Sequence, residues 1–91
     1  MEIIRYLGDN LATYMGISPI ASRGLLKLSI KDELGPFIDF KKITYNDLSK
    51  VINSSFKNRL IKLEISRYQA IINFILDELS KNQSLSTIAD K

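Results

Sequence analysis

Apolar residues recur every three or four positions along most of this chain, which is the pattern of helices that each bury one face. The first stripe begins at Ile3, ends at Met15 and predicts a helix over residues 2–15. Gly8 lies in the middle of that helix and costs about 1 kcal/mol relative to alanine, so the helix needs packing to hold it. We expect it to end at Gly16, because glycine commonly follows the last turn of a helix.

The second helix carries a start signal and a stop signal. Ser18 can cap the free N–H groups of a first turn, and Pro19 suits the first helical position because its missing donor is harmless there. Gly35 and Pro36 form the matching stop, so a helix is predicted over residues 19–34. Its apolar residues cover more than half of its circumference, which is typical of a central helix covered on two sides.

The middle of the chain is predicted to hold a connector followed by one or two helices. Residues 37–40 are too short for a sheet and read as an extended connector pinned by its aromatics. Thr44 and Asp47 then form a capping-box pair that opens the next helix. Residues 45–63 keep one apolar face, so they form either one long helix or two. The poor helix formers at residues 53–55 favour a break, with one of the two serines capping a fourth helix.

The last helix is predicted from a second capping box, made of Ser66 and Gln69, to about residues 81–82. Residues 83–91 are mostly polar and are expected to form a loosely ordered tail. The fold class is therefore all-α: a compact bundle of four to five short helices in a single domain over residues 1–82. Oligomerisation could complete that bundle.

Composition narrows the chemistry of the chain. Among its 91 residues there is neither cysteine nor histidine, which removes disulfides, structural zinc, thiol nucleophiles and the commonest general base. Apolar residues make up 45% of the chain and charged residues 25%, values typical of a folded globular domain. No apolar run is long enough for a bilayer span, and no secretory signal opens the chain, so we expect no membrane contact and a cytoplasmic location.

Catalysis is not expected. The acidic residues are scattered over helix ends and faces, and no pair has metal-ligand spacing. Asp32 and Glu33 oppose the dipole at the end of their helix without an evident reason. The chain also lacks phosphate-cradling glycine motifs and the nucleophile elbow. We therefore predict a protein that is not an enzyme and that uses neither a cofactor nor a metal.

Residues 11–18, with Ser22 and Arg23 after them, supply a small residue, a turn glycine and a hydrophobic–serine pair before a helix. This order resembles the helix-turn-helix of transcription regulators, over about 20 residues. The resemblance implies that the helix of residues 19–34 lies in the major groove of DNA. Ser22, Arg23 and Lys27 would then face bases or phosphates.

Two departures from that pattern favour a plain glycine turn between two packed helices. Ser22 occupies the position where the family buries valine or isoleucine, and Gly24 lies inside the would-be recognition helix. The net charge is +3, and one basic ridge follows a spacing of four on this helix. A small DNA-binding protein that uses residues 11–34 remains the alternative function. Its candidate nucleic-acid contacts are Arg23, Lys27 and Lys31.

The leading functional prediction is a non-catalytic protein-protein interaction module. Five amphipathic segments carry more isoleucine and leucine than one small bundle must bury, and surplus apolar surface tends to be covered by another chain. We therefore expect a homodimer or a subunit of a larger assembly, unless a tight bundle buries all of these side chains. The predicted interface residues are Leu26, Ile30 and Ile72, which lie off the main stripes.

Overall fold

The computed structural model describes residues 2–82, and side chains from residue 3 onward. Over this range the fold is all-α, a bundle of short helices, as the apolar periodicity predicts. Helix α1 spans Glu2–Met15 and helix α2 spans Pro19–Leu34, which are the predicted bounds. The predicted tail, residues 83–91, lies outside the described residues.

The predicted caps fix both ends of α2. The Ser18 hydroxyl accepts a hydrogen bond of 3.1 Å from the Ala21 N–H, which satisfies one free donor of the first turn. At the other end Gly35 adopts a positive φ of 105°, and its N–H donates to the Lys31 carbonyl. Gly16, with φ of 73°, makes the turn between α1 and α2. Both glycines therefore occupy backbone conformations that side chains disfavour.

One long rod replaces the predicted break in the middle of the chain. Helix α3 covers Tyr45–Val51, a π-helical turn η2 covers Ile52–Phe56, and helix α4 covers Lys57–Lys62, without interruption. The capping box that opens α3 is present as predicted. The prediction that a serine caps a separate fourth helix is wrong, because no side-chain cap precedes α4.

The three poor helix formers stay helical because their side chains find partners. The Asn53 amide donates to the Ser49 carbonyl one turn earlier. Ser54 and Ser55 both donate their hydroxyls to the Glu33 carboxylate on α2. The wider π turn also suits the apolar spacing of four in this segment. That spacing drifts by about 40° per step on a regular α-helix, and a wider turn counteracts the drift.

Helix α5 spans Tyr68–Lys81, so its predicted end is confirmed and its predicted start is not. Arg67 stands at the cap position and no side chain caps the helix, whereas the Gln69 amide donates to Asn73. The connector after α2 holds a 3-10 turn, η1, over Phe40–Lys42. Within residues 2–82 the connector forms no strand, as expected. The prediction that its aromatics pin an extended segment is wrong for Phe37, which is 97% exposed, and Phe40 opens the 3-10 turn.

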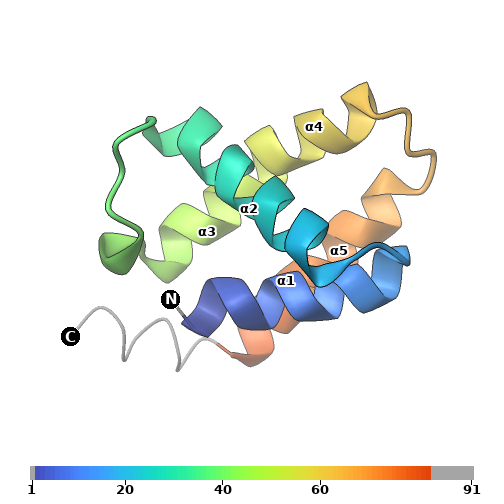
Figure 1. Cartoon of the computed structure of the whole chain (residues 1–91), viewed down its shortest axis with the longest axis horizontal. Coiled ribbons are helices and arrows are strands. Elements are labelled where there is room, and N and C mark those ends of the chain that lie inside the picture. The colour runs from blue at the N-terminus through green and yellow to red at the C-terminus, as the bar shows by residue number, and fades with distance from the viewer. Residues whose placement is uncertain (1, 83–91) are drawn as a thin grey trace.

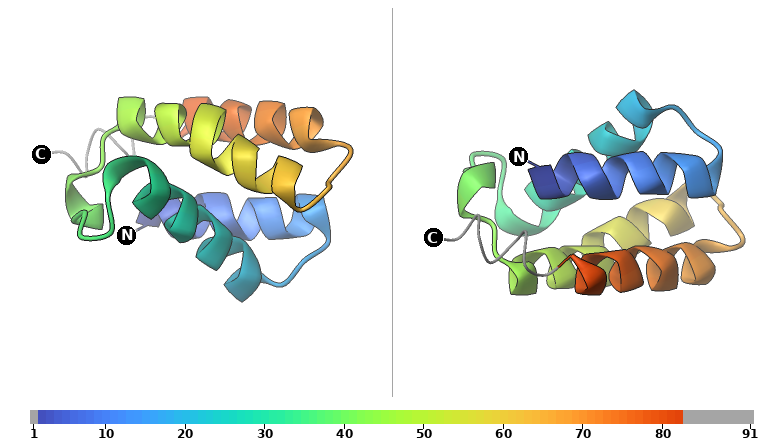
Figure 2. Two further views of the ribbon diagram at one scale, coloured as in Figure 1. Left: turned by 90° about the horizontal axis from the view of Figure 1, so that it is seen from above. Right: turned by 90° about the horizontal axis from the view of Figure 1, so that it is seen from below.

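The helices pack in two layers. Figures 1 and 2 show α1 and α2 on one side, and the rod of α3, η2 and α4 together with α5 on the other. Within the described residues, no helix has both the length and the apolar character that a bilayer span requires. Apolar side chains from every layer meet in one core, whose largest fully buried members include Leu7, Leu11, Ile30, Phe56, Leu60 and Ile75.

Candidate functional site

Helix α2 has an unusual distribution of polar and apolar side chains. Its inner face buries two serines, Ser22 and Ser29, together with Leu26 and Ile30. On the outer side, however, Ile20 is 81% exposed and Leu28 is 49% exposed. A helix that exposes large apolar side chains and buries serines is not fully accounted for by the packing of its own chain.

Close contact with α1 explains Ser22, the first buried residue of the inner face. The Ser22 hydroxyl donates a buried hydrogen bond of 2.6 Å to the Gly8 carbonyl. A Cβ at Gly8 would lie 2.4 Å from Cγ of Arg23 and 3.3 Å from its Cα. Glycine and serine therefore let the two backbones approach where larger side chains would hold them apart.

The outer face of α2 has its own glycine, and no contact within the chain explains it. Gly24 lies one turn from both Ile20 and Leu28 on the same side of the helix. Apart from the adjoining backbone of α2 itself, a Cβ at Gly24 would meet no atom of the described residues within 4 Å. Gly24 has no positive φ, so neither space nor backbone conformation requires glycine here. We call Ile20, Gly24 and Leu28 the outer stripe of α2.

Further exposed apolar side chains lie at the end of the bundle where α1 turns into α2. Figures 1 and 2 place the connection from α4 to α5 at this same end. Ile17 lies in the turn between α1 and α2, and Leu63, which is 60% exposed, lies in the connection between α4 and α5. Phe37 is 97% exposed but belongs to the connector after α2, at the opposite end.

This apolar end is held together by aromatic contacts. The ring of Tyr14 stacks on Phe74, with ring centroids 4.2 Å apart and planes inclined by 8°. The Arg67 guanidinium lies over the same Tyr14 ring at 5.6 Å and donates a hydrogen bond of 3.2 Å to the Tyr14 carbonyl. These contacts fix the end of α1 against Arg67 and against the middle of α5.

The predicted interface residues lie elsewhere. Leu26, Ile30 and Ile72 are buried in the core, with 2%, 0% and 1% of their surfaces exposed. They cannot form an exposed contact surface in this fold, so that residue assignment is corrected. The useful signal in the sequence was the outer stripe, where Ile20 and Leu28 stand two helical turns apart with a glycine between them.

The residues named for DNA contact divide into two groups. Lys27 and Lys31 are exposed, whereas the Arg23 side chain packs on α1 and forms an ion pair with Asp9 at 3.2 Å. Ser22 faces the core rather than a groove. The helix-turn-helix interpretation therefore keeps the two lysines and loses its other two proposed contacts.

A small hollow nevertheless gathers positive charge beside α2. It has a volume of about 120 Å³ and is lined by Ile4 and Arg5 of α1, Arg23 and Lys27 of α2, and Phe40 of η1. The geometry thus brings Arg5, which sequence reasoning did not select, beside two of the three predicted contacts. No sequence signal could have paired residues from helices whose packing was unknown.

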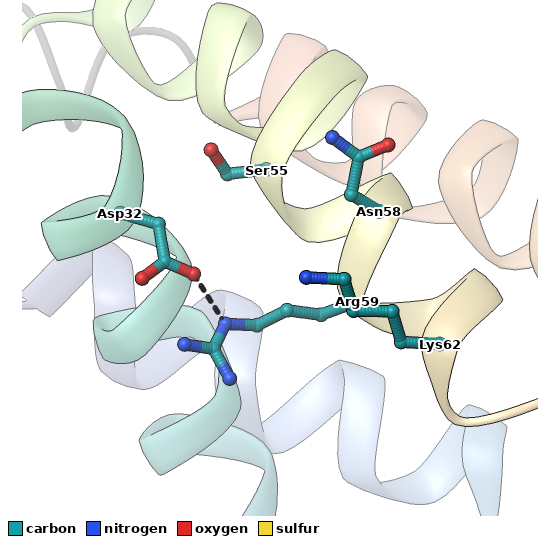
Figure 3. A pocket seen from close by; sticks show the side chains of 5 residues that line it. All are labelled: Asp32, Ser55, Asn58, Arg59 and Lys62. Carbon is teal, nitrogen blue, oxygen red and sulfur yellow. Dashed lines mark hydrogen bonds and ion pairs between the residues drawn. The ribbon is translucent and has the colours of Figure 1, made fainter.

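A second, polar cleft lies between α2 and α4 (Figure 3). Its volume is about 320 Å³, and Asp32 contributes its lining from α2. The Arg59 guanidinium donates a hydrogen bond of 2.6 Å to the Asp32 carboxylate across the cleft. The remaining lining residues come from η2 and α4: Ser55, Asn58, Arg59 and Lys62.

This cleft explains the two acidic residues at the end of α2. Hydrogen bonding to Arg59 lowers the pKa of Asp32, and hydrogen bonds from Ser54 and Ser55 lower the pKa of Glu33. Both carboxylates therefore hold the rod against α2, which offsets their unfavourable position relative to the helix dipole. Among residues 2–82 there is no cluster of three metal-ligating side chains. The Asp32–Arg59 contact across the cleft joins α2 to α4.

Comparisons with protein-family models, with curated proteins and with solved structures each found no match to this chain.

Proposed function

We propose that this chain is a non-catalytic helical interaction module that forms a homodimer through the outer face of α2. The observation that carries the proposal is the outer stripe: Ile20 and Leu28 face solvent on either side of Gly24. A helical glycine costs about 1 kcal/mol relative to alanine, and nothing within the chain uses the space that Gly24 leaves. A second helix crossing at Gly24 would use that space and cover both apolar side chains.

The register of α2 favours an antiparallel crossing of two copies. With the two-fold axis at Gly24, Leu28 would meet Ile20 of the partner subunit, and Lys27 would meet Ala21 of the partner subunit. A parallel crossing would instead set Lys27 against Lys27 of the partner subunit, which like charge disfavours. The stripe is thus self-complementary, as a two-fold symmetric interface requires.

The surroundings of the stripe extend this interface. Ile17 lies one turn before Ala21, and Leu63 is exposed at the same end of the bundle. Fully burying an isoleucine or leucine contributes about 1.5–3 kcal/mol, and a two-fold axis doubles each contribution. Association also costs translational and rotational freedom, so the stripe needs this additional apolar surface to form a stable dimer.

Sedimentation of the full chain from low to high micromolar concentration tests the proposal. We expect the native chain to form dimers, and the double variant Ile20→Ser with Leu28→Ser to remain monomeric over the same range. The matched control is Phe37→Ser, because Phe37 is equally apolar, 97% exposed and distant from the stripe. Helical circular dichroism confirms that each variant folds.

A native chain that stays monomeric at the highest concentration contradicts self-association. Loss of the dimer in Phe37→Ser, with retention in the double variant, would place the interface at the other end of the bundle.

Binding to duplex DNA is the second candidate function, favoured by the exposure of Lys27 and Lys31 along α2. It would rest on phosphate contacts, because Arg23 is paired with Asp9. A titration at two salt concentrations separates the two functions. Affinity that falls steeply with salt supports DNA binding, and absence of binding at low salt excludes it.

A further inference from the structure

The hollow between α1, α2 and η1 combines a small volume with a concentration of positive charge. Three of its five lining side chains are cationic: Arg5, Arg23 and Lys27. The other two, Ile4 and Phe40, supply an apolar wall. A hollow whose lining combines cations with hydrocarbon favours an anion, because the lining side chains exclude part of the solvent that would otherwise screen the charges.

The cations around the hollow are not all neutralised. Arg23 forms an ion pair with Asp9, in which Nε and Oδ1 are 3.2 Å apart. Among the side chains that the structure describes, no carboxylate lies within 4.0 Å of Arg5 or Lys27. Asp39 immediately precedes Phe40, but its carboxylate accepts a hydrogen bond from the Lys41 N–H. Two positive charges therefore remain available to a ligand.

Arg23 is already engaged within the chain. Its Nε is buried and lies 3.2 Å from Oδ1 of Asp9, so the negative charge of that carboxylate offsets the positive charge of Arg23 beside the hollow. The planar guanidinium of Arg5, by contrast, suits the oxygens of an oxyanion.

The size of the hollow restricts the ligand. Its volume of about 120 Å³ is well below the range of about 300–1,000 Å³ for sites that enclose drug-sized molecules. At about 30 Å³ per water molecule, it has room for on the order of four waters. A tetrahedral oxyanion of five heavy atoms is of this size, whereas a whole nucleotide is not.

Lys31 extends the positive rim. Its Nζ lies 6.0 Å from the centroid of the Phe40 ring, the same ring that lines the hollow. Lys27 and Lys31 stand one turn apart on α2, so both can approach an anion bound against Phe40. From these observations we infer that the hollow is a binding site for a single phosphate group, held by Arg5 and Lys27.

Heteronuclear NMR titration of the full chain with inorganic phosphate tests this inference, with sodium chloride at equal ionic strength as the reference. We expect saturable shifts of the amides of Arg5, Lys27 and Phe40, beyond those that chloride produces. Arg5→Gln and Lys27→Gln should each weaken the apparent affinity at least several-fold. The matched control, Lys50→Gln, removes an equally exposed cation on α3, and it should leave the affinity unchanged.

Three outcomes would overturn the inference. Phosphate-induced shifts no larger than those of chloride would mean that the shifts report general charge screening rather than binding in the hollow. Equal weakening by Lys50→Gln would mean that net charge, rather than this hollow, attracts phosphate. Duplex DNA that binds without involvement of Arg5, while inorganic phosphate does not bind, would assign the lysines of α2 to a nucleic-acid surface instead. If inorganic phosphate and DNA compete for the same shifted amides, the inference holds, and the group that binds in the hollow is a phosphate of the nucleic-acid backbone.

Discussion

Gly8 and Gly24 both lie inside helices of the same layer, but their surroundings differ completely. Gly8 faces α2, where an added Cβ would collide with Cγ of Arg23 at 2.4 Å. Gly24 faces away from the core, and an added Cβ would meet nothing within 4 Å among the described residues apart from the adjoining backbone of α2. The first glycine is thus explained by the fold and the second is not. This difference identifies the face of α2 on which we place a second copy of the chain.

The largest predicted change in stability is at Gly8, where α1 contacts α2. Gly8→Ala should destabilise the chain by about 1–3 kcal/mol, because overpacking at Arg23 outweighs the gain in helix propensity. Chemical denaturation at low protein concentration measures the change. An unchanged or higher free energy of unfolding would mean that the backbones of α1 and α2 separate at no cost. Close contact with Arg23 would then not explain Gly8.

At Gly24 the predicted change in the free energy of unfolding has the opposite sign. In the monomer, Gly24→Ala should raise the free energy of unfolding by about 0.5–1 kcal/mol, because alanine favours the helix and meets no neighbour. The same substitution should weaken dimerisation, because it fills the crossing point. Denaturation under dilute conditions and sedimentation at high concentration separate these effects. A destabilised monomer would reveal a contact within the chain at Gly24.

The smallest effect concerns the other end of α2, where the chain satisfies its own polar groups. Asp32 and Glu33 have ordinary pKa values of 3.8 and 4.5, and both pKa values are lowered in the folded chain. Their stabilisation is therefore present above those ordinary values and is lost as the pH falls through the lower folded values. Denaturation midpoints should fall accordingly in acid. The effect should be modest, because both carboxyl groups are exposed to solvent screening.

A paired variant isolates that contribution. Glu33→Gln should flatten the acid dependence, and Glu64→Gln on the exposed connection before α5 should leave it unchanged. If both variants titrate like the native chain, the hydrogen bonds from Ser54 and Ser55 do not lower the pKa of Glu33.

Much of the fold could be predicted from local signals. The bounds of α1 and α2 follow from apolar spacing and from the Ser18, Gly16 and Gly35 signals, because capping chemistry acts within a few residues. The continuous rod could not be predicted, because the polar groups of Ser54 and Ser55 are satisfied by Glu33, a residue distant in sequence. Propensity at these positions was overridden by a tertiary contact.

The candidate site was less predictable than the fold. The apolar spacing predicts an excess of isoleucine and leucine beyond the main stripes, but it assigns this excess to Leu26, Ile30 and Ile72, which the core buries. An apolar helix such as α2 can turn either side inward, and local spacing does not decide between them. In the structure, the Ser22 hydroxyl donates a hydrogen bond to the Gly8 carbonyl, so the side of α2 that carries this serine faces α1.

Cysteine crosslinking between positions 21 and 27 tests the proposed dimer most directly, because the chain contains no cysteine and the outer stripe stays intact. A disulfide requires Cα atoms about 4.4–6.8 Å apart, a separation that is reached only where two surfaces are in contact. In the antiparallel crossing, position 27 meets position 21 of the partner subunit. Under mild oxidation, the double variant Ala21→Cys with Lys27→Cys should therefore form a covalent dimer rapidly and nearly completely, whereas the exposed control Phe37→Cys should react slowly. Equal rates for the two variants, or faster reaction of Phe37→Cys, would contradict a dimer that crosses at the outer face of α2.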